Sequence, residues 1–107
     1  MKQFKFKIKN HIWKVEIMPE ICLLKEYHKR QPEAYACLGL TFYKDHKIWI
    51  AEDLHEDEKI RTLRHELTHC YIWENGFYNV DFNNEELICD FVASISGFIS
   101  EVIEKVE

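Results

Sequence analysis

The chain has 107 residues, a length that fits one domain with one modest core and excludes multi-domain enzymes and doubly wound dinucleotide-binding folds. Hydrophobic residues make up 47% of it and only 3 residues are glycine, which is the composition of an ordered globular protein. The net charge is -5, with a basic excess in residues 1–50 and an acidic excess in residues 51–107. Because no arginine cluster is interleaved with aromatic residues, we do not expect nucleic-acid binding.

The chain lacks the sequence signals of a membrane or secreted protein. No apolar run approaches the ~18 residues that read as a membrane span, and the N-terminal stretch has no continuous apolar segment of the signal-peptide kind. We therefore expect a cytoplasmic protein with one domain over residues 1–107 and no membrane partner. The four cysteines form no C-x-x-C pair, so we expect reduced, mostly buried thiols at Cys22, Cys37, Cys70 and Cys89.

The first half of the chain predicts two β-hairpins. Apolar and charged residues alternate through residues 4–8 and 13–17, which is typical of half-buried strands. A two-residue turn at Asn10-His11 would pair Ile8 with Trp13, Phe6 with Val15 and Phe4 with Ile17. Residues 20–30 predict a short helix that ends before Pro32. The apolar runs 35–43 and 48–51, joined by a turn at 44–47, predict a second hairpin in the same antiparallel sheet.

The second half predicts two long helices. Asp53 and Glu56 fit a capping box, apolar residues then recur at three- and four-residue steps, and Gly76 is a C-terminal stop. A cap at Asn83 or Asn84 would open a final helix that runs towards Lys105. Its expected core face comprises Leu87, Ile88, Phe91, Val92, Ile95, Phe98, Ile99 and Val102. The predicted fold class is therefore α+β, with both helices packed against one face of an antiparallel sheet of two hairpins.

The stretch from His65 to His69 has the pattern H-E-x-x-H and lies in the strongest helical pattern of the chain. Residues four apart project from one face of a helix, so His65 and His69 can bind one zinc ion together. Glu66 lies about 100° further round the helix, beside such an ion, where it can act as general base towards a water molecule. We therefore predict a zinc centre with Glu66 as the catalytic residue.

A three-ligand zinc site requires one further donor, and no histidine follows His69. The third ligand is therefore expected to be a carboxylate of the final helix, Glu86 or Glu85. Glu86 is favoured because it shares a helical stripe with Asp90 and with two small residues that allow close approach. Asp90 could then accept a hydrogen bond from the far ring nitrogen of a ligand histidine. Glu85 remains the alternative ligand.

These two motifs resemble the signature of the gluzincin metallopeptidases, in which a downstream E-x-x-x-D supplies the third zinc ligand and a supporting aspartate. The string HELTH resembles that of thermolysin-like enzymes, and the order of elements over about residues 39–98 resembles the ImmA/IrrE-type endopeptidases of bacteria, phages and mobile elements. That resemblance implies a zincin-like core, peptide-bond hydrolysis and a protein or peptide substrate. This chain departs from the ImmA-type pattern at Thr68, where glycine is usual, and at Cys89, where alanine is usual.

Peptide hydrolysis also requires a donor that stabilises the oxyanion. The candidates are Tyr35, Tyr43, His46, Tyr71 and Tyr78, and the sequence does not choose among them. The substrate is expected to pair with a sheet edge provided by residues 35–51.

Two rival interpretations stay open at this point. The chain could be a zinc-binding interaction module without activity, encoded by a phage or mobile element, although binding alone does not require Glu66. The motif could also be a coincidence in a small interaction domain. The sequence leaves the oligomeric state open.

Overall fold

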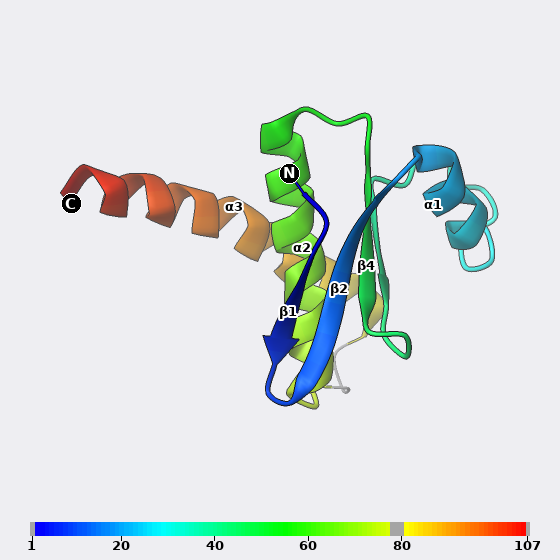
Figure 1. Ribbon diagram of the computed structural model, residues 1–107, viewed down its shortest axis with the longest axis horizontal. Coiled ribbons are helices and arrows are strands. Elements are labelled where there is room, and N and C mark those ends of the chain that lie inside the picture. The colour runs from blue at the N-terminus through cyan, green and yellow to red at the C-terminus, as the bar shows by residue number, and fades with distance from the viewer. Residues whose placement is uncertain (1, 78–80, 107) are drawn as a thin grey trace.

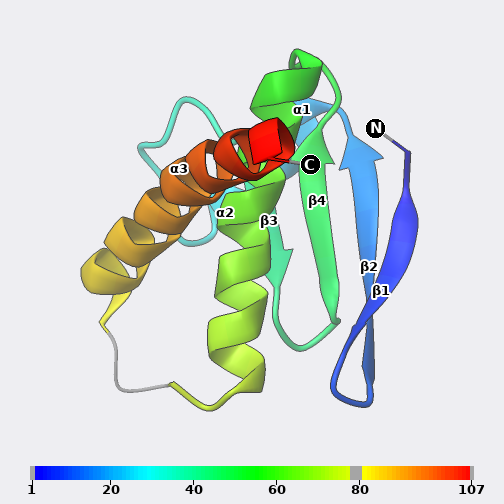
Figure 2. The same cartoon turned by 90° about the vertical axis from the view of Figure 1, so that its left-hand side faces the viewer.

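The computed structural model describes residues 2–77 and 81–106, and these form a four-stranded sheet between helices (Figure 1). The elements in chain order are β1 (Phe4–Ile8), β2 (His11–Met18), α1 (Glu20–Tyr27), β3 (Gly39–Phe42), β4 (Lys47–Ala51), α2 (Glu56–Glu74) and α3 (Phe82–Val106). α1 lies on one side of the sheet and α2 on the other, with α3 packed on α2 (Figures 1 and 2). The predicted α+β class is confirmed. None of the described helices is long and apolar enough to cross a membrane.

The sheet is mixed, so the prediction of a purely antiparallel sheet is wrong. Its strand order is β1-β2-β4-β3, and the two hairpins join through a parallel pairing of β2 with β4. After β2 the chain passes through α1 to the far edge of the sheet, forms β3 there and returns as β4 between β3 and β2 (Figure 2). Alternating residues specify which side chains share a face, but they do not specify which strand of one hairpin joins the other.

The first hairpin has a different register from the predicted one. Phe4 pairs with Val15 and Phe6 with Trp13, which shifts the pairing by two residues and moves the turn to Lys9-Asn10. Lys9 accordingly has a positive φ of 55°. Because a shift of two residues preserves the alternation between faces, the apolar side chains still share the inner face.

The helix boundaries also differ in part from expectation. Asp53 does not cap α2: the helix begins at Glu56, and the preceding His55 makes no capping side-chain hydrogen bond. α3 is capped by Asp81, whose carboxylate accepts a 3.0 Å hydrogen bond from the backbone N–H of Asn84. The predicted stop at Gly76 is confirmed by its left-handed φ of 74°, which favours glycine.

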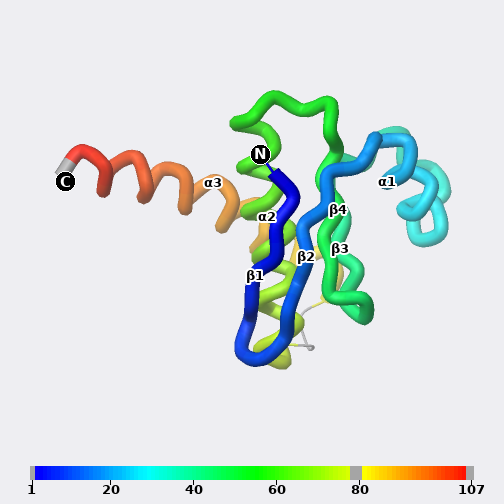
Figure 3. Tube along the Cα trace, viewed as in Figure 1, coloured from blue at the N-terminus to red at the C-terminus, as the bar shows by residue number. Residues whose placement is uncertain are grey.

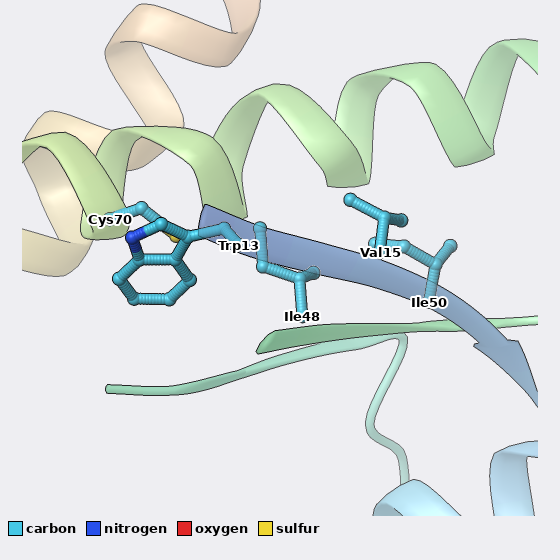
Figure 4. Close-up of a cluster of buried hydrophobic side chains, with 5 residues drawn as sticks. All are labelled: Trp13, Val15, Ile48, Ile50 and Cys70. Carbon is cyan, nitrogen blue, oxygen red and sulfur yellow. The ribbon is translucent and has the colours of Figure 1, made fainter. Parts of the chain in front are cut away.

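The main core lies between the sheet and α2. Trp13 and Val15 of β2, Ile48 and Ile50 of β4, and Cys70 of α2 are fully buried and touch one another (Figure 4). A smaller cluster around Leu23 of α1 fills the opposite face of the sheet. All four cysteines are free thiols, and three of them are buried, as expected.

The predicted core face of α3 is wrong for six of its eight residues; only Val92 and Ile95 are half-buried. Phe91 is 65% exposed and Phe98 is 61% exposed, whereas Cys89 and Ala93 are the residues buried against α2. Small side chains allow α3 to approach α2 closely, so the helix packs through its narrow small-residue side. The large apolar side chains that hydropathy alone assigns to the core therefore face away from the rest of the described chain.

Glu74, at the end of α2, connects this helix to the first hairpin. Its carboxylate accepts hydrogen bonds from Trp13 Nε1 at 3.0 Å and from His11 Nδ1 at 2.6 Å, and its side chain is only 3% exposed. Replacing Glu74 with alanine leaves the part-buried indole N–H unsatisfied. We expect the free energy of unfolding to fall by about 1–3 kcal/mol, measured by urea denaturation. Glu58→Ala, on the exposed first turn of α2, is the control and should change it by about 0.5 kcal/mol or less.

Candidate metal centre

α2 and α3 bring the three predicted metal ligands together. His65 and His69 lie one turn apart on α2, and their Nε2 atoms are 3.2 Å apart. Glu86, from the first turns of α3, places Oε2 3.3 Å from His65 Nε2 and Oε1 2.7 Å from His69 Nε2. Two ring nitrogens and one carboxylate therefore converge on one point between the helices.

The separations of these atoms fit a zinc ion. A tetrahedral ion with bonds of about 2.0–2.1 Å has ligand atoms roughly 3.3 Å apart, close to the observed 2.7–3.3 Å. Two histidines and one carboxylate are also a ligand set of open catalytic zinc sites, which keep a fourth position for water. The residues present thus suit zinc in both geometry and chemistry.

Each of the two histidines also contacts a carboxylate through Nδ1, the ring nitrogen that faces away from the common point. Asp90 Oδ1 lies 2.9 Å from His65 Nδ1, and Glu85 Oε2 lies 2.6 Å from His69 Nδ1. These contacts fix the rings with Nε2 directed at the common point, as outer carboxylates of zinc sites do. The geometry places Asp90 where the sequence predicted it. It gives Glu85 a positioning role that the sequence did not predict, and the adjacent pair Glu85-Glu86 was the signal for it.

These contacts shift the pKa values of the side chains in the cluster. Hydrogen bonds from His65 and His69 lower the pKa of Glu86 to about 2, although burial opposes the shift. Burial by itself would lower the pKa of His69, but hydrogen bonds with Cys89 and Glu86 raise it to about 11. A histidine binds metal only when its ring nitrogen is free of its proton, so metal binding must displace protons here.

Cys89 is a further potential ligand that sequence reasoning missed. Its thiol is fully buried, and its sulfur and one ring nitrogen each of His65 and His69 all lie within 4.8 Å of one another. Helical periodicity places Cys89 one turn after Glu85 on α3. Only the close packing of α3 on α2 brings it to the histidines.

Glu66 lies beside the ligand cluster and is buried. Its Oε2 is 4.0 Å from His65 Nε2, and its Oε1 accepts a 2.7 Å hydrogen bond from the Thr41 hydroxyl of β3. Burial raises the pKa of Glu66, partly offset by the charges of the nearby histidines and by the Thr41 hydrogen bond. A buried carboxylate with a raised pKa that lies next to a candidate metal site suits proton transfer.

Gly39 makes room for the Glu66 side chain. A Cβ at position 39 would lie 2.6 Å from Thr62 Cγ2, 3.0 Å from Glu66 Cγ and 3.1 Å from Glu66 Oε2. Gly39→Ala should therefore displace Glu66; if the site binds zinc and hydrolyses peptide bonds, the rate should fall by at least about tenfold, with zinc content unchanged. The measurement is an initial-rate assay on labelled casein together with metal analysis. Gly97→Ala is the control, because its Cβ would meet only the flexible end of Arg64. Equal rates for Gly39→Ala and the wild type would contradict this role of Gly39.

A cavity of about 290 Å³ opens onto the site between β3, α2 and α3, and it is lined by His65, Glu66, His69 and Glu86. Among the described candidates for the oxyanion donor, only Tyr43 lines it. The Tyr43 hydroxyl donates to Glu85 Oε2 at 3.2 Å. Arg30 also lines the cavity and was not singled out from the sequence.

The other candidate donors lie elsewhere. Tyr35 is 94% exposed and Tyr71 is 60% exposed, and neither lines the cavity. His46 stacks on the Trp13 ring at the tip of the second hairpin. Tyr78 lies outside the described residues. Tyr35, Tyr71 and His46 therefore do not belong to the cavity. The sequence could not exclude them, because helical and strand periodicity do not show which loops meet at a cavity.

No family model, curated protein or solved structure matches this chain. What the site can do is therefore inferred from its own side chains and their arrangement.

Proposed function

We propose that this protein is a zinc-dependent endopeptidase in which His65, His69 and Glu86 hold the metal and Glu66 is the general base. The observation that carries the proposal is the convergence of the Nε2 atoms of His65 and His69 and the two carboxylate oxygens of Glu86, with contacts of 2.7–3.3 Å, and the separate buried carboxylate of Glu66 beside them. A purely structural metal site does not require a carboxylate such as Glu66 beside its ligands, whereas metal-assisted hydrolysis requires a general base there.

A zinc ion at this site would act as a Lewis acid towards a peptide carbonyl and would lower the pKa of water to about 7. Glu66 accepts the proton of the attacking water and later delivers it to the leaving amine. Thr41 holds one Glu66 oxygen, which leaves Oε2 directed towards the histidines. Asp90 and Glu85 keep the rings oriented, and Tyr43 holds Glu85 in turn.

The edge of the sheet favours an extended peptide as substrate. β3 is the last strand of the sheet and pairs only with β4 among the described strands. Its residues Gly39, Leu40 and Thr41 line the cavity next to Glu66. An extended segment that added to β3 would pass along the site, which is a common mode of peptide recognition. We therefore propose unfolded or extended protein segments as the substrate class.

One observation favours a second candidate function, a zinc-binding module without activity. If Cys89 joined His65, His69 and Glu86, the four protein ligands would close the tetrahedron as in structural zinc sites. Water would then have no position on the metal, and Glu66 would have no proton to accept.

Replacing Cys89 with alanine separates the two candidates. For an endopeptidase, we expect one zinc per chain and chelator-sensitive cleavage of labelled casein in the wild type. In that case Cys89→Ala should keep both the zinc content and the cleavage rate within about twofold of the wild type, since the substitution removes no metal ligand. A wild type that binds zinc but cleaves nothing, together with a variant that has lost zinc affinity, would instead assign the closed site. Metal analysis and a fluorescence assay of the same preparations provide both measurements.

A further inference from the structure

The outer face of α3 is an apolar surface that none of the described residues covers. We define this α3 outer face by its most exposed members, which are Leu87, Ile88, Phe91, Phe98, Ile99 and Val102, each between 41% and 67% exposed. In a helix of 100° per residue they lie opposite Cys89 and Ala93, the side that packs on α2. The outer side of α3 is therefore apolar and has no partner within the described chain, whereas the side that packs on α2 carries small residues and the metal-site carboxylates.

The α3 outer face is at the upper end of what an isolated chain normally exposes. From the exposed fractions, its six side chains present roughly 600 Å² of surface, taking about 200 Å² for a fully exposed residue of this size. The largest apolar patch of a typical monomer is about 300–600 Å², and patches of this kind mark interaction sites. A standard interface buries about 800 Å² per partner, of which slightly more than half is apolar. One helix face thus provides the apolar area that a stable dimer requires.

The spacing of the face fits another helix of the same kind. Apolar residues on this side of α3 recur at steps of three and four residues, which is the seam that packs one helix along another. They are Ile88, Phe91, Phe98 and Val102 of the α3 outer face, with the half-buried Ile95 between them. The C-terminal half of α3 also projects beyond α2, so a second helix can lie along it without meeting the body of the protein (Figures 1 and 3).

Charge favours a second copy over a lipid surface. The acidic residues Asp90, Glu101 and Glu104 lie off the α3 outer face, so two copies could meet without burying like charges. A helix that binds a membrane surface usually has lysine and arginine on its polar side. This helix has acidic residues there, and residues 51–107 carry four basic against 14 acidic residues.

We propose that the chain forms a symmetric dimer in which the α3 outer face of one copy packs along that of the other. In a two-fold interface the same patch occurs on both sides, so each side chain contributes twice. The two candidate metal centres remain separate, because each centre lies between α2 and α3, on the side of α3 away from the α3 outer face.

Sedimentation equilibrium of the full chain tests this proposal. We expect the wild type to have twice the 13.0 kDa chain mass, and the double variant Phe91→Glu, Phe98→Glu to dissociate with a dimer constant weakened at least about 100-fold. The matched control carries the same two charges at exposed apolar positions elsewhere, as Ile12→Glu, Ile21→Glu, and should remain dimeric. Circular dichroism verifies that each variant is folded. If the double variant is unfolded, Val102→Glu on the projecting half of α3 replaces it.

Several outcomes would overturn the dimer. A wild type with the mass of one chain throughout the concentration series would do so. An average mass that rises beyond that of two chains with increasing concentration, without levelling off, would also do so. A folded Phe91→Glu, Phe98→Glu variant that keeps the two-chain mass would place the interface elsewhere. A monomeric wild type that sediments with phosphatidylcholine vesicles would assign the face to lipid and contradict the proposal.

Discussion

Glu66→Gln is expected to abolish peptide hydrolysis and to leave zinc bound. Glutamine has the same shape as glutamate and can still accept the Thr41 hydrogen bond through Oε1, so the packing around it should be retained. It cannot take a proton from water at neutral pH. Because general-base catalysis contributes about 10²–10⁴-fold to the rate, we expect kcat to fall by that factor. Initial rates on labelled casein and the zinc content of the same samples are the measurements.

The control for this substitution is Glu58→Gln, the same change on the exposed first turn of α2. It should behave as the wild type in both measurements. Cleavage by Glu66→Gln at the wild-type rate would show that Glu66 is not the base. Loss of zinc from Glu66→Gln would show instead that Glu66 is a ligand, which the 4.0 Å separation from His65 Nε2 argues against.

Glu86→Ala is expected to cause the largest loss of zinc affinity among the carboxylate substitutions on α3. Its oxygens lie 3.3 Å from His65 Nε2 and 2.7 Å from His69 Nε2, so it is the carboxylate placed to bind the metal directly. Of the two ligand histidines, Glu85 contacts only His69, at its far nitrogen Nδ1 and at 2.6 Å. Loss of such an outer contact costs about 10–100-fold in affinity, and loss of a direct ligand should cost more.

Glu85→Ala is therefore the matched partner of Glu86→Ala, since the two substitutions truncate neighbouring glutamates near the start of the same helix. Competition with a fluorescent zinc chelator measures both affinities. A larger loss in Glu85→Ala than in Glu86→Ala would exchange their roles and make Glu85 the ligand.

The sequence predicted the relative placement of side chains correctly where that placement depends on local geometry. Residues four apart on one helix must share a face, so His65 and His69 could be placed together, with Glu66 beside them, from the sequence alone. Glu86 and Asp90 followed from the same periodicity on the next helix. The alternating residues of the first hairpin likewise predicted its inner face, although not its register.

The contributions of distant segments could not be predicted in this way. Thr41 and Gly39 reach Glu66 only because β3 lies at the sheet edge next to α2, and this placement depends on the parallel pairing of β2 with β4. Cys89 approaches the histidines because α3 packs through its small residues. Hydropathy predicted that the large apolar residues of α3 belong to the core. It indicates that such residues tend to be buried, but not whether the surface that buries them belongs to the same chain.

The sequence by itself thus determined the candidate chemistry: a helix with two histidines and a glutamate, and a second helix with the third ligand. The tertiary structure decided which groups surround that chemistry, and which apolar face remains uncovered. The physical reason is one of range. Helical and strand periodicity act over a few residues, whereas strand order and helix packing depend on contacts between residues far apart in the chain.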